Sequence, residues 1–256
     1  MIKIKEVWGE DPEFSGPRNW FREVLIVKAI KKWKKSGKIL DFGSGSGHLL
    51  LRLAQEGFAG IGIDNSPPAV NYAHQKIQEK HLEHKLKIIL GDENTLFRLK
   101  DKFDVVVSGE TLEHLKDDRR AVAGISRVLN KSGICVVTAP AHPWLWDIND
   151  EFSGHHHRYE QTDLQQLFKR AGFEVRTIFY WGFPLGLIWH KLLYLPLVRK
   201  KMESKRKIIY SESKTLFGKI IRSEKLKQMF SKIFYFDQLF NWTKLGGGLL
   251  LVAQKP

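Results

Sequence analysis

The sequence predicts an α/β fold, a doubly wound sheet of mainly parallel strands. From Gly37 onward, short apolar runs alternate with amphipathic stretches, which is the pattern of repeated strand–helix units. A glycine-rich turn follows the first apolar run, and acidic residues stand where later runs end. The 256 residues, 43% of them hydrophobic, suffice for one main domain with its own core. This composition excludes a disordered chain, a collagen-like fibre and a polytopic membrane protein.

The elements follow from hydrophobic spacing and end signals. Strands are expected at Lys38–Phe42, Gly60–Asp64, Lys87–Leu90, Phe103–Ser108, Ile134–Ala139, Glu174–Phe179 and Gly248–Gln254. Helices are expected at Trp20–Lys35, His48–Glu56, Pro68–Lys80, Asp117–Leu129 and Thr162–Ala171. Ser66 before two prolines is a favourable helix start, and Gly172 is a natural helix stop. In the first helix, Phe21, Val24, Leu25 and Ala29 share the face expected to be buried.

The chain divides into four parts: a lead-in helix region (1–36), a core (37–183), a helical insertion (184–241) and a final core strand (242–256). The insertion is far longer than a strand connection needs. Between Gly186 and Phe240 there are 13 Lys/Arg and 4 Asp/Glu, so this segment carries +9 of the net charge of +14. Its opening run, GFPLGLIWHKLLYLPLV, is interrupted by prolines and a lysine and is too short for a membrane span.

Two interpretations of the insertion remain open. It is either a helical lid over the ligand end of the sheet with solvated lysines, or an aromatic and basic surface that rests on an anionic membrane. The N-terminus lacks the apolar core of a secretion signal, and the single Cys135 permits no internal disulfide and no cysteine-built metal cluster. The expected location is cytoplasmic, with peripheral association at the inner membrane face under the second interpretation.

The strongest local signal is Asp41-Phe42-Gly43-Ser44-Gly45-Ser46-Gly47, where a strand ends in an acid and turns through three alternating glycines into a helix. Glycine lets the backbone turn tightly and approach a ligand closely. The pattern is G-x-G-x-G, with His48 in place of the last glycine of a dinucleotide-binding turn, and no Lys-Ser/Thr follows as in a triphosphate-binding loop.

Acids also end the next two strands, at Asp64 and Asp92, and Ser108 ends the fourth. A carboxylate at the end of the second strand can accept hydrogen bonds from both ribose hydroxyls of an adenosine that lies across the strand tips. A single strand-end aspartate is usually a helix cap. A series of them beside a glycine turn indicates a nucleoside site.

Taken together, these segments resemble the class I S-adenosylmethionine-dependent methyltransferases, in the small-molecule branch. The matching residues are DFGSGSG at 41–47, GID at 62–64, GD at 91–92, FDVVVSGETLEHL at 103–115 and RVLNKSGICVVTAP at 127–140. The resemblance implies a seven-stranded, Rossmann-like doubly wound sheet whose last strand is antiparallel, here delayed by the insertion. It implies S-adenosylmethionine as the cofactor.

The resemblance also implies the cofactor residues. The methionine part would face Asp41 and the turn residues Gly43, Ser44, Gly45 and Gly47. The ribose would face Asp64, with Asn65 beside it. The adenine would face Asp92 and the backbone of Glu93, and Ser108 would line the floor beneath the sulfonium.

The fourth strand gives information about the acceptor. Relatives that methylate exocyclic amines usually carry Asn/Asp-Pro-Pro-aromatic there, whereas this chain has Ser108-Gly109-Glu110-Thr111. Glu113-His114 recurs in many small-molecule members, which makes Glu113 a candidate catalytic residue and His114 a structural hydrogen-bonding residue.

The loop after the fifth strand contains His155-His156-His157-Arg158-Tyr159. It resembles the His-x-Arg-Arg-Tyr element of small-molecule methyltransferases, with His157 at a position that is often arginine. His155 is the first choice for a general base or an acceptor-orienting group, because imidazole titrates near neutral pH. Tyr159 is a further catalytic candidate, although Tyr159 and Arg158 could simply pin the loop.

A metal site is the alternative at this loop. Its potential ligands would be Asp147, Asp150, Glu151 and the three histidines. Consecutive histidines cannot all point at one ion, so no metal is expected.

Three functions stay open. The favoured one is in-line methyl transfer to a small-molecule or lipid-linked acceptor, in which the protein mainly aligns the reactants and excludes water. The second is an RNA methyltransferase that uses the basic insertion on phosphates, and the third is a cofactor-binding protein without catalysis. The oligomeric state is not predicted.

Overall fold

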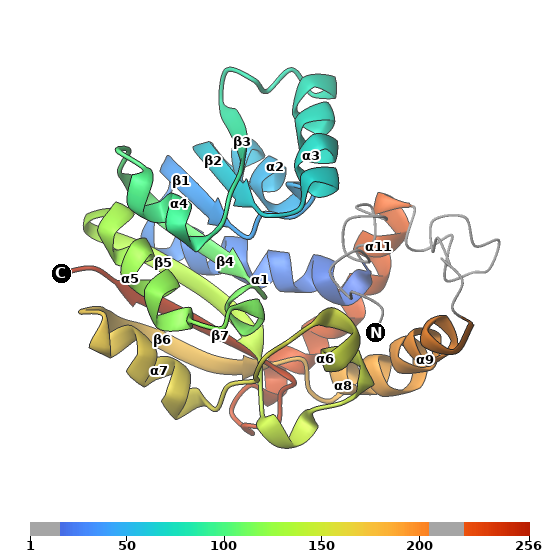
Figure 1. Ribbon diagram of the computed structural model, residues 1–256. Coiled ribbons are helices and arrows are strands. Elements are labelled where there is room, and N and C mark those ends of the chain that lie inside the picture. The colour runs from blue at the N-terminus through green and yellow to red at the C-terminus, as the bar shows by residue number, and fades with distance from the viewer. Residues whose placement is uncertain (1–15, 205–222) are drawn as a thin grey trace.

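The computed structural model describes residues 16–204 and 223–256, which form one seven-stranded sheet with helices on both faces (Figure 1). The strands are β1 (Gly37–Phe42), β2 (Phe58–Asp64), β3 (Leu86–Leu90), β4 (Phe103–Gly109), β5 (Leu129–Pro140), β6 (Glu174–Trp181) and β7 (Gly248–Gln254). Their order is β3-β2-β1-β4-β5-β7-β6. The first five strands are parallel, and β7 runs antiparallel between β5 and β6. The predicted fold is confirmed, including the antiparallel last strand.

The strand order places the ligand crevice. The chain runs outward from β1 to β2 and β3 and then returns to the other side of β1 with β4. In open α/β sheets, ligands bind beyond the carboxyl ends of the strands where the order reverses. Here that point lies between the ends of β1 and β4.

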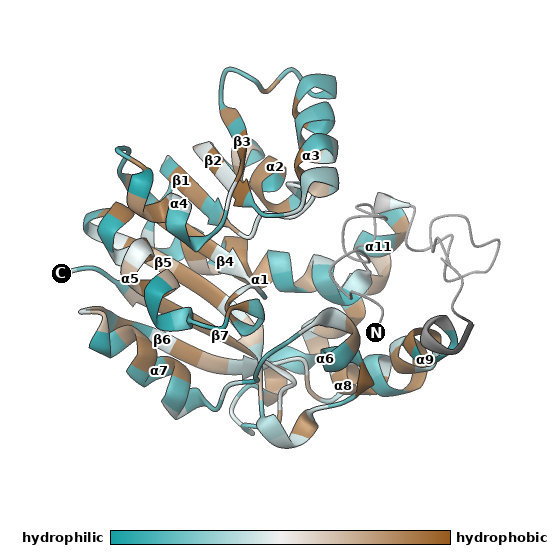
Figure 2. Ribbon diagram, viewed as in Figure 1, coloured by the Kyte–Doolittle hydropathy of each residue, from teal (hydrophilic) through white to brown (hydrophobic). Residues whose placement is uncertain are grey.

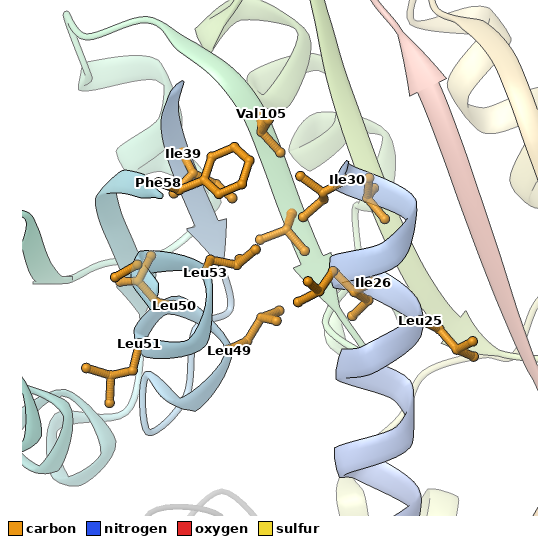
Figure 3. Close-up of a cluster of buried hydrophobic side chains, with 14 of the residues drawn as sticks. Leu25, Ile26, Ile30, Ile39, Leu49, Leu50, Leu51, Leu53, Phe58 and Val105 are labelled. Carbon is orange, nitrogen blue, oxygen red and sulfur yellow. The ribbon is translucent and has the colours of Figure 1, made fainter. Parts of the chain in front are cut away.

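Two hydrophobic layers enclose the sheet, because successive strand residues point to opposite faces. Ile39 packs in one layer and Leu40 in the other. The first layer is covered by α1 (Pro17–Trp33), α2 (His48–Gln55) and α3 (Pro67–Glu79). The second is covered by α4 (Glu93–Arg98), α5 (Asp118–Val128) and α7 (Gln161–Arg170). Figure 3 shows the first layer, in which Ile26 and Ile30 of α1 meet leucines of α2. In Figure 2 the sheet is the most apolar part of the molecule.

The predicted boundaries hold within two residues except at one strand start and one helix start. The helix expected from Trp20 begins at Pro17, because Gly16 precedes a proline suited to the first turn. β5 begins at Leu129, where the prediction started at Ile134, since an irregularity between Phe103 and Val105 lets Leu129 pair with β4.

Two six-residue helices were not predicted: α4 and α6 (Ile148–Ser153). Each begins with a capping box, Asp92 with Thr95 and Asp147 with Asp150, so the aspartates bond the exposed amides of the first turn. Such short helices carry too few apolar positions for a periodic signal.

The described parts of the insertion are helical, as predicted. It contains α8 (Leu185–Trp189), the π-helical turn η4 (His190–Tyr194), α9 (Leu195–Ser204), α11 (Glu224–Ser231) and the 3₁₀ helix η6 (Lys232–Phe240). α9 packs on α6, and α11 and η6 pack on α1. The middle of the predicted insertion, 205–222, lies outside the described residues. Among residues 16–204 and 223–256, no helix has both the length and the apolar character to cross a bilayer.

Candidate active site

The glycine turn between β1 and α2 forms a close-fitting cradle. At Gly43 the backbone has φ +77°, and a Cβ there would lie 2.1 Å from Oγ1 of Thr111. At Gly45, with φ +51°, a Cβ would meet nothing within 4 Å. The amides of Gly43 and Ser44 both donate to the carbonyl of Ile63, at 2.8 and 3.0 Å. The turn is therefore fixed to β2 on one side and opens at Gly45 on the other.

Asp64, at the end of β2, is held by two backbone amides. Its Oδ2 accepts from the amide of Gly45 at 2.7 Å and its Oδ1 from the amide of Ser66 at 2.9 Å. Ser66 itself caps α3, as predicted, because its hydroxyl accepts from the amide of Ala69. Asp64 thus joins the glycine turn to the start of α3, and its neighbour Asn65 is exposed.

Three buried polar groups at this edge have no hydrogen-bond partner among the described residues. They are Oδ2 of Asp41, Oγ of Ser44 and Oγ of Ser108. Burial first, and then the nearby carboxylates of Glu23 and Asp64, raise the pKa of Asp41 to about 8. Buried polar groups without partners are costly. The three buried oxygens therefore suit a ligand that brings hydrogen-bond donors and positive charge to the carboxyl edge of the sheet.

Asp92, at the end of β3, serves as the N-cap of α4. Its carboxylate accepts from the amide of Asn94 at 3.0 Å and from the side-chain amide of Asn94 at 3.1 Å. Asp92 is exposed and Glu93 half-buried, so both remain accessible at the rim. The capping role shows that this aspartate has a local structural function as well as the ligand role predicted for it.

The lead-in helix contributes to the site in a way that was not predicted. Glu23 of α1 is buried, and its carboxylate lies 2.8 Å from Nδ1 of His48 and 3.7 Å from Nη1 of Arg52. His48 and Arg52 belong to α2, which the glycine turn starts. The available signal was a glutamate next to the apolar face that contains Phe21 and Val24. A charge at such a position requires partners.

The segment after β4 brings Glu113 beside the cradle. The hydroxyl of Thr111 donates to the carbonyl of Phe42 at 3.3 Å, which fixes η2 (Leu112–His114) against the glycine turn. Glu113 is fully buried, and neither carboxyl oxygen has a partner in the described part of the chain. Burial, followed by the charge of Glu110, raises the pKa of Glu113 well above its ordinary value. The environment of Glu113 therefore favours its protonated, neutral form.

His155 is oriented by a buried carboxylate. Its Nδ1 lies 2.7 Å from Oδ1 of Asp150, and Arg158 donates to both oxygens of Asp150 at 2.8 and 2.7 Å. Burial raises the pKa of Asp150, but the hydrogen bonds from His155 and Arg158 outweigh this and bring it to about 2. Asp150 is thus ionised and can only accept, so Nδ1 of His155 carries the hydrogen, and in the neutral ring the lone pair lies on Nε2.

Glu113, His114 and His155 come together at this point. Each offers one potential ligand atom, and these atoms lie within 4.8 Å of one another. The rings of His114 and His155 meet edge to face, with centroids 4.7 Å apart. Burial and the neighbouring His155 lower the pKa of His114 to about 4. The trio can exchange protons with a bound acceptor or hold a metal ion.

The alternative metal ligands predicted in the loop do not form one group in the structure. Asp147 pairs with His190 of the insertion at 2.8 Å, and Asp150 pairs with Arg158. His157 lies 3.4 Å from Asp118, and Glu151 is exposed. Asp147, Asp150 and His157 therefore belong to three separate ion pairs.

Tyr159 anchors the loop. Its hydroxyl is 2.8 Å from Oδ2 of Asp118 and 2.5 Å from Nε2 of His157, and its backbone pairs with Ala141. Burial raises the pKa of this phenol, and Asp118 raises it further. Of the two roles considered for Tyr159, the structure favours pinning the loop, because its hydroxyl is already engaged on α5. Arg158 likewise holds Asp150 in place.

Comparison with known proteins identifies the family. Residues 18–178 match the family model of a methyltransferase domain, which is more than half of the chain. The uncharacterized methyltransferase YcgJ of Bacillus subtilis is 28% identical over 190 residues, which cover 69% of this chain and 73% of YcgJ. The chloroplastic 2-methyl-6-phytyl-1,4-hydroquinone methyltransferase 1 of Oryza sativa subsp. japonica is 27% identical over 163 residues, 62% of this chain and about half (48%) of that protein.

A solved structure shows the same fold over the whole chain. The phosphoethanolamine N-methyltransferase 2 of Haemonchus contortus, in complex with S-adenosyl-L-methionine, has a TM-score of 0.64 at 16% identity and covers 99% of this chain and 57% of that one. The residues at the carboxyl edge of the sheet suit that cofactor. The buried oxygens of Asp41 and Ser44 have no hydrogen-bond partner among the described residues, and a positively charged ligand with hydrogen-bond donors would supply one. The chain therefore belongs to the methyltransferase-domain family, and it is an S-adenosylmethionine-dependent methyltransferase.

Proposed function

We propose that this enzyme methylates a hydroxyl group of an apolar, lipid-linked small molecule, with His155 as the general base. The observation that carries the proposal is the Asp150–His155 pair, which leaves Nε2 of His155 free beside the buried acid Glu113. Thr111 connects this group to the glycine turn, so the acceptor and the cofactor would meet at one end of β4.

The cofactor supplies a methyl group on a positively charged sulfur. On this proposal Asp41, Ser44 and the glycine turn hold its methionine part, and Ser108 lies beneath the sulfur. Asp64 with Asn65 holds the ribose, and Asp92 with the backbone of Glu93 holds the adenine. The buried atoms of Asp41, Ser44 and Ser108 that lack partners support this arrangement.

The protein's chemical task is to align the acceptor and to move one proton. Nε2 of His155 would take the hydroxyl proton, and the acceptor oxygen would gain the methyl group as the bond from that group to the cofactor's sulfur breaks, which releases a neutral thioether. Asp150 would stabilise the resulting imidazolium. Glu113, whose pKa is raised by burial, would in its protonated form donate a hydrogen bond that fixes the acceptor oxygen. Alignment accounts for about 7–11 kcal/mol of barrier reduction in well-oriented systems, and a base adds about 10²–10⁴-fold.

The apolar acceptor class is supported by two further observations. The rice relative is named for a phytyl hydroquinone, a phenol with an isoprenoid tail. The insertion packs on α6, next to His155, and exposes large apolar side chains such as Leu192. A soluble, charged metabolite would gain nothing from such surroundings.

The test is turnover of a prenylated hydroquinone with S-adenosylmethionine by the full chain, followed by mass spectrometry of the product. We expect an O-methylated product, and His155→Gln should lower kcat by about 10²–10⁴-fold. The matched control is His156→Gln, because His156 is the exposed neighbour of His155. This control should retain turnover.

Three outcomes would contradict the proposal. Binding of S-adenosylmethionine without turnover of any apolar hydroxyl acceptor would favour a non-catalytic role, and methyl incorporation into RNA would favour the basic insertion as an RNA-binding element. Loss of turnover on treatment with a chelator would make Glu113, His114 and His155 a metal site instead of a proton-transfer group.

A further inference from the structure

An exposed apolar stripe runs along η6 and the turn that follows it. A 3₁₀ helix has three residues per turn, so side chains three apart stand directly above one another. Ile233, Phe236 and Leu239 have this spacing and are 52, 49 and 66% exposed. Asn241 continues the helical backbone (φ −61°, ψ −16°), which adds Trp242, 79% exposed, to the same row. We call these four residues the η6 stripe.

A second row of η6, which contains Phe234 and Asp237, is buried and fixes the stripe to the protein. Phe234 is buried, with ring centroids 5.9 Å from both Phe21 of α1 and Trp189 of α8. Asp237 is buried, and its carboxylate accepts from the amides of Leu185 and Gly186 at 2.8 Å each. The 3₁₀ helix is therefore anchored through one row of residues, and the η6 stripe is presented outward on a rigid support.

Positive charges lie beside the stripe. Lys232 and Lys244 flank it in the sequence and are exposed. Nζ of Lys28 lies 4.6 Å from the ring centroid of Tyr235, also in η6. Lys28 belongs in turn to an open groove of about 440 Å³ on α1, which Lys31, Lys32 and Lys35 also line. The surface around the stripe is thus apolar at its centre and basic at its margin.

We propose that the η6 stripe is a membrane-docking surface that inserts into the headgroup region of an anionic bilayer. Apolar and aromatic side chains framed by lysines suit this interface, where the apolar groups enter the acyl boundary and the lysines meet lipid phosphates. A second copy of the chain is the poorer occupant. A two-fold contact would bring the same lysines face to face, and each copy carries a net charge of +14.

This surface would bring the enzyme to the phase that holds a lipid-linked acceptor. In that respect the inference rests on the proposed function. The docking itself needs neither S-adenosylmethionine nor turnover, so a binding experiment separates the two: failure to dock leaves the chemistry at His155 untouched, and failure of turnover leaves docking untouched.

The first experiment is co-sedimentation of the full chain with phosphatidylcholine vesicles with and without phosphatidylglycerol. Binding should require the anionic lipid. Phe236→Ser with Trp242→Ser should weaken it by at least about tenfold, since each removes a large apolar side chain from the interface. Lys232→Gln should weaken it about fivefold. The matched control is Leu90→Ser, a side chain 55% exposed on β3, at the sheet edge opposite β6. It should bind as the unaltered protein does.

A second experiment reports on the stripe directly. Trp242→Cys is labelled with an environment-sensitive fluorophore, while the natural Cys135 stays unreactive because it is fully buried. Anionic vesicles should shift the emission to the blue, whereas label at Leu90→Cys should show no shift. A shift that depends on protein concentration without vesicles would establish self-association instead, a shift caused by RNA alone would establish nucleic-acid binding, and no response to vesicles would overturn the proposal.

Discussion

At the residue scale, the site combines carboxyl groups of opposite protonation. Asp150 is ionised because Arg158 and His155 bond to it, whereas burial raises the pKa of Asp41 to about 8 and that of Glu113 well above its ordinary value. Environments that shift the pKa values of neighbouring carboxyl groups in opposite directions allow one group to act as an acid and another as a carboxylate within one site. Here the ionised carboxylate supports the base, and the neutral carboxyl groups face the positions proposed for the ligands.

Asp41→Asn should stabilise the ligand-free protein by about 1 kcal/mol at neutral pH, because it removes an acid whose ionisation is unfavourable when folded. The pKa of Asp41 is raised from 3.8 to about 8, so the folded state retains a proton that the unfolded chain releases. Stability of the unaltered protein should therefore fall as pH rises through that interval, and the variant should lack this contribution. Unfolding midpoints across the interval measure it.

The control for this change is Asp163→Asn, an exposed acid in α7. Its pH profile should follow that of the unaltered protein, and a parallel profile for Asp41→Asn would contradict the assignment. Asp41→Asn should also bind S-adenosylmethionine more weakly, since asparagine cannot ionise to pair with the positive charge of the cofactor. In this variant the protein would gain stability and lose cofactor affinity, as is common for changes at active-site residues.

At the scale of elements, one polar contact joins two helices of the insertion to each other and another joins the insertion to the core. Asp237 of η6 bonds the first amides of α8, and His190 of η4 pairs with Asp147 at the start of α6. The first contact fixes the support of the η6 stripe, and the second links the insertion to the loop that carries His155. Both connect segments far apart in the sequence.

Asp237→Ala should lower the free energy of unfolding by about 1–3 kcal/mol, because it leaves the amides of Leu185 and Gly186 without their acceptor. Urea denaturation measures the change, and Asp237→Asn, which keeps one acceptor oxygen, should lose less. Gln238→Ala is the matched neighbour on another row of η6 and should have a smaller effect. Equal losses for Asp237→Ala and Gln238→Ala would show that the two bonds do not support the insertion.

At the scale of the whole molecule, cofactor binding should stabilise the fold, because the site draws on β1, β2, β4 and the helices at their ends. A ligand at a hundredfold excess over Kd stabilises the native state by about 2.7 kcal/mol. The unfolding midpoint should rise accordingly with S-adenosylmethionine.

Asp64→Ala should abolish most of this rise, with a loss of about 1.5–3 kcal/mol in cofactor binding free energy. Asp64→Asn separates this effect from the loss of the bonds to Gly45 and Ser66, since it retains an acceptor oxygen. Calorimetry gives the dissociation constants. An unchanged constant in Asp64→Ala would place the ribose elsewhere.

Much of the fold could be predicted from local patterns. Strands of a buried parallel sheet are continuous apolar runs, and core helices of eight or more residues show a periodic apolar face, so all seven strands and the helices α1, α2, α3, α5 and α7 were expected. Short helices such as α4 gave no periodic signal. The placement of the glycine turn and the acids at one edge of the sheet was predictable as well, because Gly43, Asp64 and Asp92 all stand at strand ends, and a parallel sheet brings those ends together.

What the sequence alone determined is therefore the sheet, its glycine turn and the row of acids on one edge, since each depends on residues close together in the chain. The tertiary structure decided that Asp150 orients His155, that Tyr159 anchors the loop and that Asp150 is ionised. Those properties depend on contacts across long separations, such as Tyr159 with Asp118 and His190 with Asp147. It also decided the η6 stripe, because a three-residue spacing becomes a surface only when the helix has three residues per turn and one of its rows is buried against α1 and α8.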